Sequence, residues 1–478
     1  MFASRFDPTR SSSIDTSKRR LGAGPVLRAG SRAPYRAVGE LLGEPQIVRS
    51  EIVAGDATRK GDPIARFAHL TDLHVTDVQS PARFEFVNRE ARDPRFRELL
   101  TMQRPHETLN THAIAAMVRA INNVEGLDLV AMTGDGIDNT QRNELDNMCA
   151  LLEGGLVSPD SGAQGYDGVQ RVDWPGDLFW KPDGAPDGDT FQRELGFPRR
   201  PGLLDDAMQP FESSGLRVPW LRCWGNHEQV CQGVGVVTPG LAEAMAGSRK
   251  PVEMPPGVDP DRAVDIFTLH PERFMTGASR AVSADPDRRR VERTDLLPSS
   301  YYVHDIGEVR YVTLDTVCDA GGADGSIDAA QLRWLEERLD EARDRYIVIL
   351  SHHGHDTLSN PRCEGRAEEL LGTLRRHPNV VLWLNGHIHA NRITPRGSFW
   401  EVTTSSLVDW PCQARLVEIY RTGSRHLAIA CTMLDHDGEG LAGLHRELAG
   451  NVPLNGFDSW RPGLPADRNA VLLLPDPF

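Results

Sequence analysis

The sequence has no apolar run of the length that a membrane-spanning helix needs. Arg19 and Arg20 stand near the start of the chain, but no apolar stretch follows them. A secretory or twin-arginine signal is therefore not expected. The first sixty or so residues are polar and rich in glycine and arginine. The sequence thus predicts neither a membrane span nor an export signal.

Cysteine is scarce as well, with seven residues and no CxxC pair: Cys149, Cys223, Cys231, Cys318, Cys363, Cys412 and Cys431. An odd number without paired spacing argues against a disulfide framework and against a thiolate zinc site. It suits a reducing compartment. Together with the missing signal, this predicts a cytoplasmic protein.

Positive charge is in deficit. The chain has 53 basic and 68 acidic side chains, a net charge of −15, and only four of the basic residues are lysine. We attribute the scarcity of lysine to genomic base composition. An acidic surface repels polyanions, so long nucleic acid is not an expected partner. A small phosphorylated substrate could still enter, because bound cations reverse the field inside a site. The oligomeric state is left open.

What the sequence does contain is a series of short apolar runs, each of about strand length, at 64–70, 127–132, 218–224, 309–314, 346–350 and 380–384. Their two faces are both apolar, which is typical of strands buried in a layered sheet. Helix-like segments lie between them at 108–124, 328–345 and 364–376. This alternation predicts an α/β sandwich. Three later runs, at 398–407, 414–423 and 425–434, are predicted as consecutive antiparallel strands.

The pattern divides the chain into three parts. Residues 1–62 form a partly irregular N-terminal extension, 63–435 the main domain, and 436–478 a C-terminal extension. Two stretches rich in glycine, proline and aspartate, 155–215 and 231–300, interrupt the main domain as insertions. Long loops inside a compact domain are usually functional or disordered. We expect part of these insertions to form a cap over the site.

Polar clusters follow five of the apolar runs, where open α/β sheets place ligands. They are Asp72-Leu73-His74, Gly134-Asp135-Gly136-Ile137-Asp138-Asn139, Gly225-Asn226-His227-Glu228, Ser351-His352-His353 and Asn385-Gly386-His387-Ile388-His389. Singly, each is explained as well by a turn or a surface histidine. Together they offer carboxylate, amide oxygen and imidazole, which suit Mn, Fe, Zn or Co ions. Two such ions joined by a carboxylate clamp an in-line displacement at phosphorus.

The ordered motifs D-x-H, GD-x-x-DN, GNHE, H and GH-x-H cover roughly 65–425 and resemble the calcineurin-like metallophosphoesterases. The resemblance implies a four-layer sandwich of two mixed β-sheets flanked by helices. It implies that Asp135 bridges two metals, that His227 protonates the leaving oxygen after attack by a metal-bridging hydroxide, and that Asp138 hydrogen-bonds His227 and keeps it cationic. The remaining implied ligands are Asp72, His74 and His389 for one metal and Asn226, His352 and His387 for the other.

The roles of some residues next to the predicted ligands are ambiguous. Strand alternation sends His352 and His353 to opposite sides, so only one is expected to bind metal. We choose His352, because in the family the histidine that directly ends the apolar run is the ligand. Glu228 is expected to support the ligands from behind. Four further residues could reach a phosphate, although surface charge and helix packing explain such residues more often; they are Arg83, Arg89, Arg104 and His106.

Departures from the family pattern indicate the subfamily. Purple acid phosphatases carry Tyr where Asp138 stands, and protein Ser/Thr phosphatases carry Arg-Gly where Asn139 and Thr140 stand. The chain looks more like the cyclic-nucleotide and glycerophosphodiester phosphodiesterases, and is also similar to an actinobacterial metallophosphoesterase family with long insertions. The resemblance implies hydrolysis of a small phosphodiester. The alternatives are a nucleotidase-like phosphomonoesterase and, in another class, a non-catalytic metal-binding scaffold.

Overall fold

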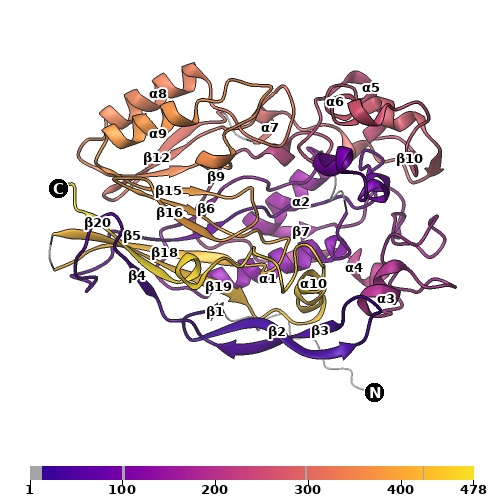
Figure 1. Cartoon of the computed structure of the whole chain (residues 1–478), viewed down its shortest axis with the longest axis horizontal. Coiled ribbons are helices and arrows are strands. Elements are labelled where there is room, and N and C mark those ends of the chain that lie inside the picture. The colour runs from indigo at the N-terminus through magenta and orange to yellow at the C-terminus, as the bar shows by residue number, and fades with distance from the viewer. Residues whose placement is uncertain (1–12, 100–102, 297–298, 424) are drawn as a thin grey trace.

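The computed structural model describes residues 13–99, 103–296, 299–423 and 425–478. Residues 1–12 of the predicted N-terminal extension and residues 297–298 of the second predicted insertion therefore lie outside the described residues. Two mixed β-sheets are stacked face to face, and helices cover the outer face of each (Figure 1). This is the predicted four-layer α/β sandwich.

The larger sheet has eight strands. Its central strands β5 (Ala65–Leu70), β6 (Leu129–Met132) and β9 (Trp220–Arg222) run parallel. The antiparallel strands β18 (Ala414–Arg421), β19 (His426–His436) and β20 (Ala470–Pro475) continue the sheet on the other side of β5. Two short strands from the start of the chain complete it, β4 (Ile47–Arg49) beside β20 and β1 (Ser13–Asp15) beside β19. Both ends of the described chain thus contribute strands to this sheet.

The smaller sheet has six strands. Its order is β12 (Tyr302–Ile306), β13 (Val309–Thr313), β14 (Tyr346–Leu350), β15 (Val380–Asn385), β17 (Trp400–Thr403) and β16 (Arg392–Pro395). The four strands from β13 to β17 are parallel. Here one expectation is wrong, because β17 does not lie next to β18. It pairs with β15 in the smaller sheet, and the loop 404–413 crosses from there to β18 in the larger sheet.

The alternation of side chains explains the layers. Along β5, Phe67 points into the core between the two sheets, whereas Ala68 points to the outer core. That outer core packs under α1 (Asn110–Asn122) and α2 (Arg142–Glu153). On the far side, α8 (Ala329–Asp340) and α9 (Ala367–Arg376) cover the smaller sheet. Because the strands are buried on both faces, their sequences are continuous apolar runs.

The two predicted insertions contain short elements. The first contains β7 (Gly155–Val157), α3 (Thr190–Leu195), α4 (Leu203–Ala207) and β8 (Phe211–Ser213). The second contains α5 (Pro239–Met245), β10 (Arg249–Pro251), α6 (Ala263–Leu269), β11 (Ser279–Ala281) and α7 (Arg293–Leu296). The N-terminal part adds a hairpin of β2 (Arg19–Arg28) and β3 (Tyr35–Leu42), which packs against α10 (Gly440–Gly450). The division at 62 and 435 remains a prediction. No helix in the described ranges has both the length and the apolar character that crossing a membrane requires.

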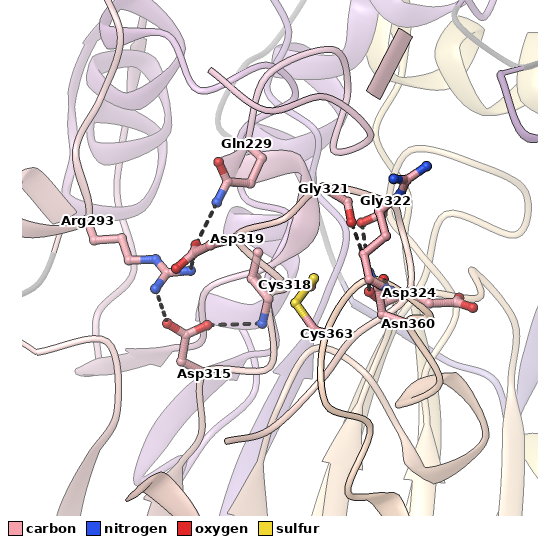
Figure 2. The surroundings of a disulfide bond; sticks show 12 residues. Gln229, Arg293, Asp315, Cys318, Asp319, Gly321, Gly322, Asp324, Asn360 and Cys363 are labelled. Atoms are coloured by element: carbon pink, nitrogen blue, oxygen red, sulfur yellow. Dashed lines mark hydrogen bonds and ion pairs between the residues drawn. A yellow bond between two sulfur atoms is a disulfide. The ribbon is translucent and has the colours of Figure 1, made fainter. Parts of the chain in front are cut away.

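A disulfide joins Cys318 and Cys363, which lie in the loops that follow β13 and β14 in the smaller sheet (Figure 2). The other five cysteines are free. The cysteine pattern did not predict this bridge, because the two residues are 45 positions apart and only the fold brings their loops together. Since disulfides are rare in a reducing cytosol, the bridge argues against the cytoplasmic location predicted above.

Around the disulfide, hydrogen bonds connect the two loops. The amide of Asn360 donates to the carbonyl oxygens of Gly321 and Asp324. On the other side, Arg293 of α7 pairs with Asp315 and Asp319 (Figure 2). The bridge therefore stands where the loops after β13 and β14 meet the second insertion.

Replacing Cys318 and Cys363 by serine is expected to lower the free energy of unfolding by about 2–4 kcal/mol, because the bridge closes a loop of 45 residues in the unfolded chain. Urea unfolding of the oxidised protein and of the double variant measures this difference. Cys149→Ser, which changes a free cysteine, is the matched control. An unchanged unfolding midpoint in the double variant would show that the bridge adds no stability.

Candidate metal centre

The predicted ligands converge at the carboxyl ends of the strands. Asp72 and His74 follow β5, Asp135 follows β6, and Asn226 begins a short 3-10 helix after β9. From the smaller sheet, His352 follows β14, while His387 and His389 follow β15. All nine predicted site residues, which include His227 and Asp138, lie in this one region. Ligand atoms of Asp72, His74, Asp135 and His389 all lie within 4.8 Å of one another.

We call Asp72, His74 and His389 the first cluster. Both histidines of this cluster have Nδ1 engaged by a carboxylate, His74 by Asp138 at 3.0 Å and His389 by Asp409 at 2.7 Å. Their Nε2 atoms therefore present lone pairs, and these atoms lie only 3.1 Å apart. Asp72 Oδ1, which is buried and has no hydrogen-bond partner, lies 3.2 Å from Nε2 of His389. A cation bound between these groups would satisfy all of them.

We call Asn226, His352 and His387 the second cluster. The Nδ1 of His352 donates to the carbonyl oxygen of Thr133 at 2.7 Å. Its Nε2 lone pair then faces Asn226 Oδ1 at 3.0 Å and Asp135 Oδ2 at 3.1 Å. Nδ1 of His387 lies 3.1 Å from the same oxygen of Asn226. Here too, several groups that can bind a metal face one point.

Asp135 lies between the two clusters. Its Oδ2 is 3.7 Å from Nε2 of His74 and 3.1 Å from Nε2 of His352. Its Oδ1 accepts a hydrogen bond from the backbone N–H of His227 at 2.8 Å. Although burial favours its neutral form, the nearby His352 and His227 hold the pKa of Asp135 well below its usual range. The carboxylate is therefore ionised and placed where a bridging ligand would be needed.

The pKa values of His74 and His352 reflect the carboxylates that surround them. Burial opposes a charge on His74, but hydrogen bonds to Asp138 and Asp72 outweigh it and raise the pKa of His74 to about 10. Burial likewise opposes a charge on His352, while the nearby Asp135 raises the pKa of His352 to about 9. In each case a positive charge at Nε2 is favoured by the surrounding carboxylates. The donor set thus fits a pair of cations.

The backbone at these positions is unusual. Five of the predicted ligands have positive φ angles, which non-glycine residues rarely adopt: Asp72 at 52°, His74 at 48°, Asp135 at 49°, His387 at 67° and His389 at 53°. Strained conformations of this kind cluster at functional sites, where the surrounding structure holds them. They turn successive side chains toward one point at the strand ends.

Two of the motif glycines are required because other side chains lie too close to leave room for a Cβ atom. A Cβ on Gly134 would collide with the imidazole of His352, and a Cβ on Gly386 would collide with Thr71 and the carboxylate of Asp72. The glycines of the GD and GH motifs therefore allow the two sheets to place their ligands side by side.

Glu228 supports the loop that carries Asp135, because its carboxylate accepts hydrogen bonds from the backbone N–H groups of Asp135 at 3.1 Å and Gly136 at 2.7 Å.

His227 lies beside the first cluster, with its ring 4.3 Å from that of His74. Its Nδ1 is 3.1 Å from Asp138 Oδ1, so the predicted hydrogen bond is present. Asp138 favours a positive charge on His227, but other groups oppose that charge. Burial and the positive charge of His74 lower the pKa of His227 below its usual value, despite Asp138. A lower pKa makes His227 a stronger proton donor but reduces its protonated fraction at neutral pH.

His353 is engaged elsewhere. Its Nδ1 accepts from the hydroxyl of Thr316 at 2.9 Å, and its Nε2 donates to the carbonyl oxygen of Ala323 at 2.9 Å. Neither ring nitrogen is left for a metal, which favours His352 as the ligand.

Among the arginines considered for phosphate binding, Arg83 and Arg104 are buried in ion pairs, with Glu107 at 2.9 Å and with Asp409 at 2.8 Å.

Sequence reasoning missed two contributors. Asp409 was not singled out, although it follows β17 in the polar segment Ser405-Ser406-Leu407-Val408-Asp409, a sixth cluster at a strand end. Gln232, at the start of the second insertion, donates from Nε2 to Asp138 Oδ2 at 3.1 Å. No local signal distinguished Gln232. Its contact places the start of that insertion against the site, where a cap was expected.

Asp and His side chains that could hold metal ions thus gather at the strand ends of a four-layer α/β sandwich. Residues 176–391 match the family model of calcineurin-like phosphoesterases, which confirms the predicted resemblance. The first two motifs, with Asp72, His74 and Asp135, precede the matched segment.

Curated relatives are similar over short segments. A probable cyclic nucleotide phosphodiesterase of Synechococcus sp. (strain WH7803) is 34% identical over 76 residues, 15% of this chain and 29% of that protein. A manganese-dependent ADP-ribose/CDP-alcohol diphosphatase of Xenopus tropicalis is 32% identical over 97 residues, 19% of this chain and 28% of that protein. A 3',5'-cyclic adenosine monophosphate phosphodiesterase of Pseudomonas aeruginosa is 30% identical over 118 residues, 24% and 42% of the two chains. The chain thus spans less than half the length of each of these relatives.

Among solved structures, a dimetal phosphatase from Danio rerio is 14% identical, with 78% of this chain and 96% of that chain covered and a TM-score of 0.40. The Plasmodium protein GAP50, an anchor in the inner membrane complex, is 11% identical, with 83% and 98% covered and a TM-score of 0.31. Both scores are too low for a residue-by-residue comparison of the sites.

Proposed function

We propose that this chain is a metal-dependent phosphoesterase that hydrolyses a small phosphodiester. The observation that carries the proposal is the pair of acceptor clusters that share Asp135, with the lone pairs of His74 and His389 facing each other at 3.1 Å. A bound cation would offset the cost of burying these polar atoms against one another, which supports a metal site here. Two of the relatives are named phosphodiesterases and a third is named a diphosphatase, which supports a phosphorus centre as the target.

The metal ligands we propose are Asp72, His74 and His389 for one ion, Asn226, His352 and His387 for the other, and Asp135 between them. Imidazole, carboxylate and amide oxygen favour Mn, Fe, Zn or Co over Ca. The name of one relative states manganese dependence. When bound, two such cations neutralise charge on a phosphoryl group and promote ionisation of a water molecule.

His227 is the proposed general acid. Because Nδ1 of His227 is directed at Asp138, its Nε2 is the ring nitrogen left to donate a proton to a leaving oxygen. Its side chain keeps 17% of its surface exposed, whereas Asp138 is 1% exposed. Asp138 orients the ring and is itself held by Gln232 and by Arg83, whose Nη2 lies 3.6 Å from Asp138 Oδ2. The chain therefore supplies both the acid and its orientation.

Two alternatives are compatible with the same fold. A phosphomonoesterase would use the same ligands, and only the space around the phosphoryl group would differ. A non-catalytic metal-binding scaffold would be expected to lack His227 or several ligands, but His227 and all of the proposed ligand residues are present in this sequence. The acidic net charge of −15 disfavours long nucleic acid and favours a small phosphorylated substrate.

The direct test is turnover of bis-p-nitrophenyl phosphate and of p-nitrophenyl phosphate by purified protein reconstituted with Mn²⁺. We expect the diester to be cleaved faster. A phosphomonoester carries a second negative charge that needs a further group to bind it, whereas the proposed acid and metals are sufficient for a diester. The Asp135→Asn variant, purified in parallel, is the control for contaminating phosphatases. Release of p-nitrophenolate gives both rates.

Faster cleavage of the monoester would replace the phosphodiesterase by the phosphomonoesterase. Absence of turnover on both esters, in protein shown to contain metal, would favour the scaffold. In the event of faster diester cleavage, cyclic nucleotides and glycerophosphodiesters are the substrates to compare next.

A further inference from the structure

The loop 404–413 crosses from the smaller sheet to the larger sheet and passes beside the first cluster. It is held in place by hydrogen bonds from the N–H of Leu407 to the carbonyl oxygen of Asp72 at 3.3 Å and from His106 Nε2 to the carbonyl oxygen of Val408 at 2.8 Å. The N–H of Asp409 donates to the hydroxyl of Ser406 at 3.0 Å. Asp409 itself is fully buried. Its side chain is therefore fixed in position before any ligand binds.

The carboxylate of Asp409 stands between two nitrogen donors, one from His389 and one from Arg104. Oδ2 accepts from Nδ1 of His389 at 2.7 Å, and Oδ1 accepts from Nε of Arg104 at 2.8 Å. A second nitrogen of Arg104 lies 3.3 Å from Oδ2. Because Nδ1 of His389 donates here, the lone pair of its Nε2 points into the first cluster, toward Asp72 and His74.

The two clusters differ in how their histidines are held. In the first cluster both imidazoles are backed by carboxylates, His74 by Asp138 and His389 by Asp409. In the second, Nδ1 of His352 bonds to the neutral carbonyl oxygen of Thr133, and Nε2 of His387 lies 3.7 Å from Oδ1 of Asp324. A carboxylate behind a ligating histidine fixes its tautomer and raises its basicity, and loss of such a partner typically weakens metal binding.

We propose that Asp409 is a positioning residue for the metal of the first cluster, with Arg104 as its counter-charge. This inference rests on the ligand set proposed above, and it concerns residues outside the segment that matches the family, 176–391. Asp409 holds His389 with Nε2 toward the metal. Arg104 compensates the buried carboxylate, since a buried charge without a partner is strongly destabilising.

Two variants distinguish the effect of the negative charge of Asp409 from the effect of its size and hydrogen bonding. Asp409→Asn keeps an oxygen that can accept from Nδ1 of His389 but removes the negative charge, and Asp409→Ala removes both. We expect Asp409→Ala to weaken the binding of one of two Mn²⁺ ions by about 10- to 100-fold, and Asp409→Asn to weaken the same ion by a smaller factor. Binding of the other ion is expected to stay within about threefold of the wild type, because the second cluster does not contact Asp409.

The measurement is a calorimetric Mn²⁺ titration of metal-free full-length protein, with metal content determined by atomic emission after dialysis. The matched control is Asp435→Asn, which changes another buried carboxylate on β19 that contacts Gln413 and lies outside both clusters. If Asp409→Ala does not fold, Asp409→Asn alone decides, because it preserves size and hydrogen bonding.

The proposal is overturned by wild-type affinity for both ions in the Asp409 variants. It is also overturned if Asp435→Asn weakens binding as much as Asp409→Asn, since the effect would then be general destabilisation. A wild-type protein that binds no Mn²⁺ would instead remove the proposed metal centre itself. A selective loss of one ion supports the role of Asp409 independently of any activity.

Discussion

Asp135→Asn is expected to reduce kcat/KM for a phosphodiester by about 10³-fold or more, because metal ions supply several kcal/mol of transition-state stabilisation and this residue is the proposed ligand shared by both ions. Oδ2 of Asp135 is the oxygen nearest to His352 and also faces His74. The amide preserves the shape of the side chain but removes the charge that would separate two cations. Steady-state rates and metal content per chain are measured on the same preparation.

The matched control is Asp319→Asn, which alters an exposed acid that pairs with Arg293. It is expected to keep wild-type metal content and activity. A rate for Asp135→Asn within tenfold of the wild type, at full metal content, would remove Asp135 from the bridging position. Loss of metal together with loss of rate is the result that we expect.

His227→Ala is expected to lower turnover of diesters with alkoxide leaving groups by about 10²–10⁴-fold, the range that general acid catalysis contributes. Turnover of bis-p-nitrophenyl phosphate is expected to fall much less, because p-nitrophenolate leaves without protonation. The metal content is expected to remain that of the wild type, since Nδ1 of His227 bonds to Asp138, which is not one of the proposed ligands. The ratio of the two losses is the quantity to measure.

His355→Ala is the matched control, because His355 is a histidine on the loop after β14 whose ring nitrogens contact Asp356 and Glu368. It is expected to leave both rates unchanged. Equal losses on the two leaving groups in His227→Ala would assign His227 a role in binding or in metal retention rather than in proton transfer.

Much of the fold was predictable because the relevant signals are local. The run 346–350 became β14 and the run 380–384 became β15 because continuous apolar stretches of this length form strands that are buried on both faces. The helix expected from the pairing of Asp328 with Gln331 begins as α8 at Ala329, with the side chain of Asp328 accepting from the backbone N–H of Gln331. Helix ends differ by a few residues, as end positions are the least constrained.

Pairing between strands was less predictable. The segment 400–403 was expected to lie next to the segment 414–421, because neighbours in sequence usually pair. In the structure, the loop between them crosses from one sheet to the other. Nothing in the local sequence of these strands encodes which sheet they join, since both have the same apolar character.

The chemistry of the site was contained in the sequence by itself: carboxylate, amide and imidazole groups at five strand ends, in an order that predicts metal binding. The tertiary structure alone decided how these groups are held. Asp409 backs His389, Thr133 backs His352, the ring of His353 is engaged by Thr316, and Cys318 meets Cys363. The physical reason is that ligand type and strand position depend on nearby residues, whereas tautomer, charge and pairing depend on contacts between segments far apart in the chain.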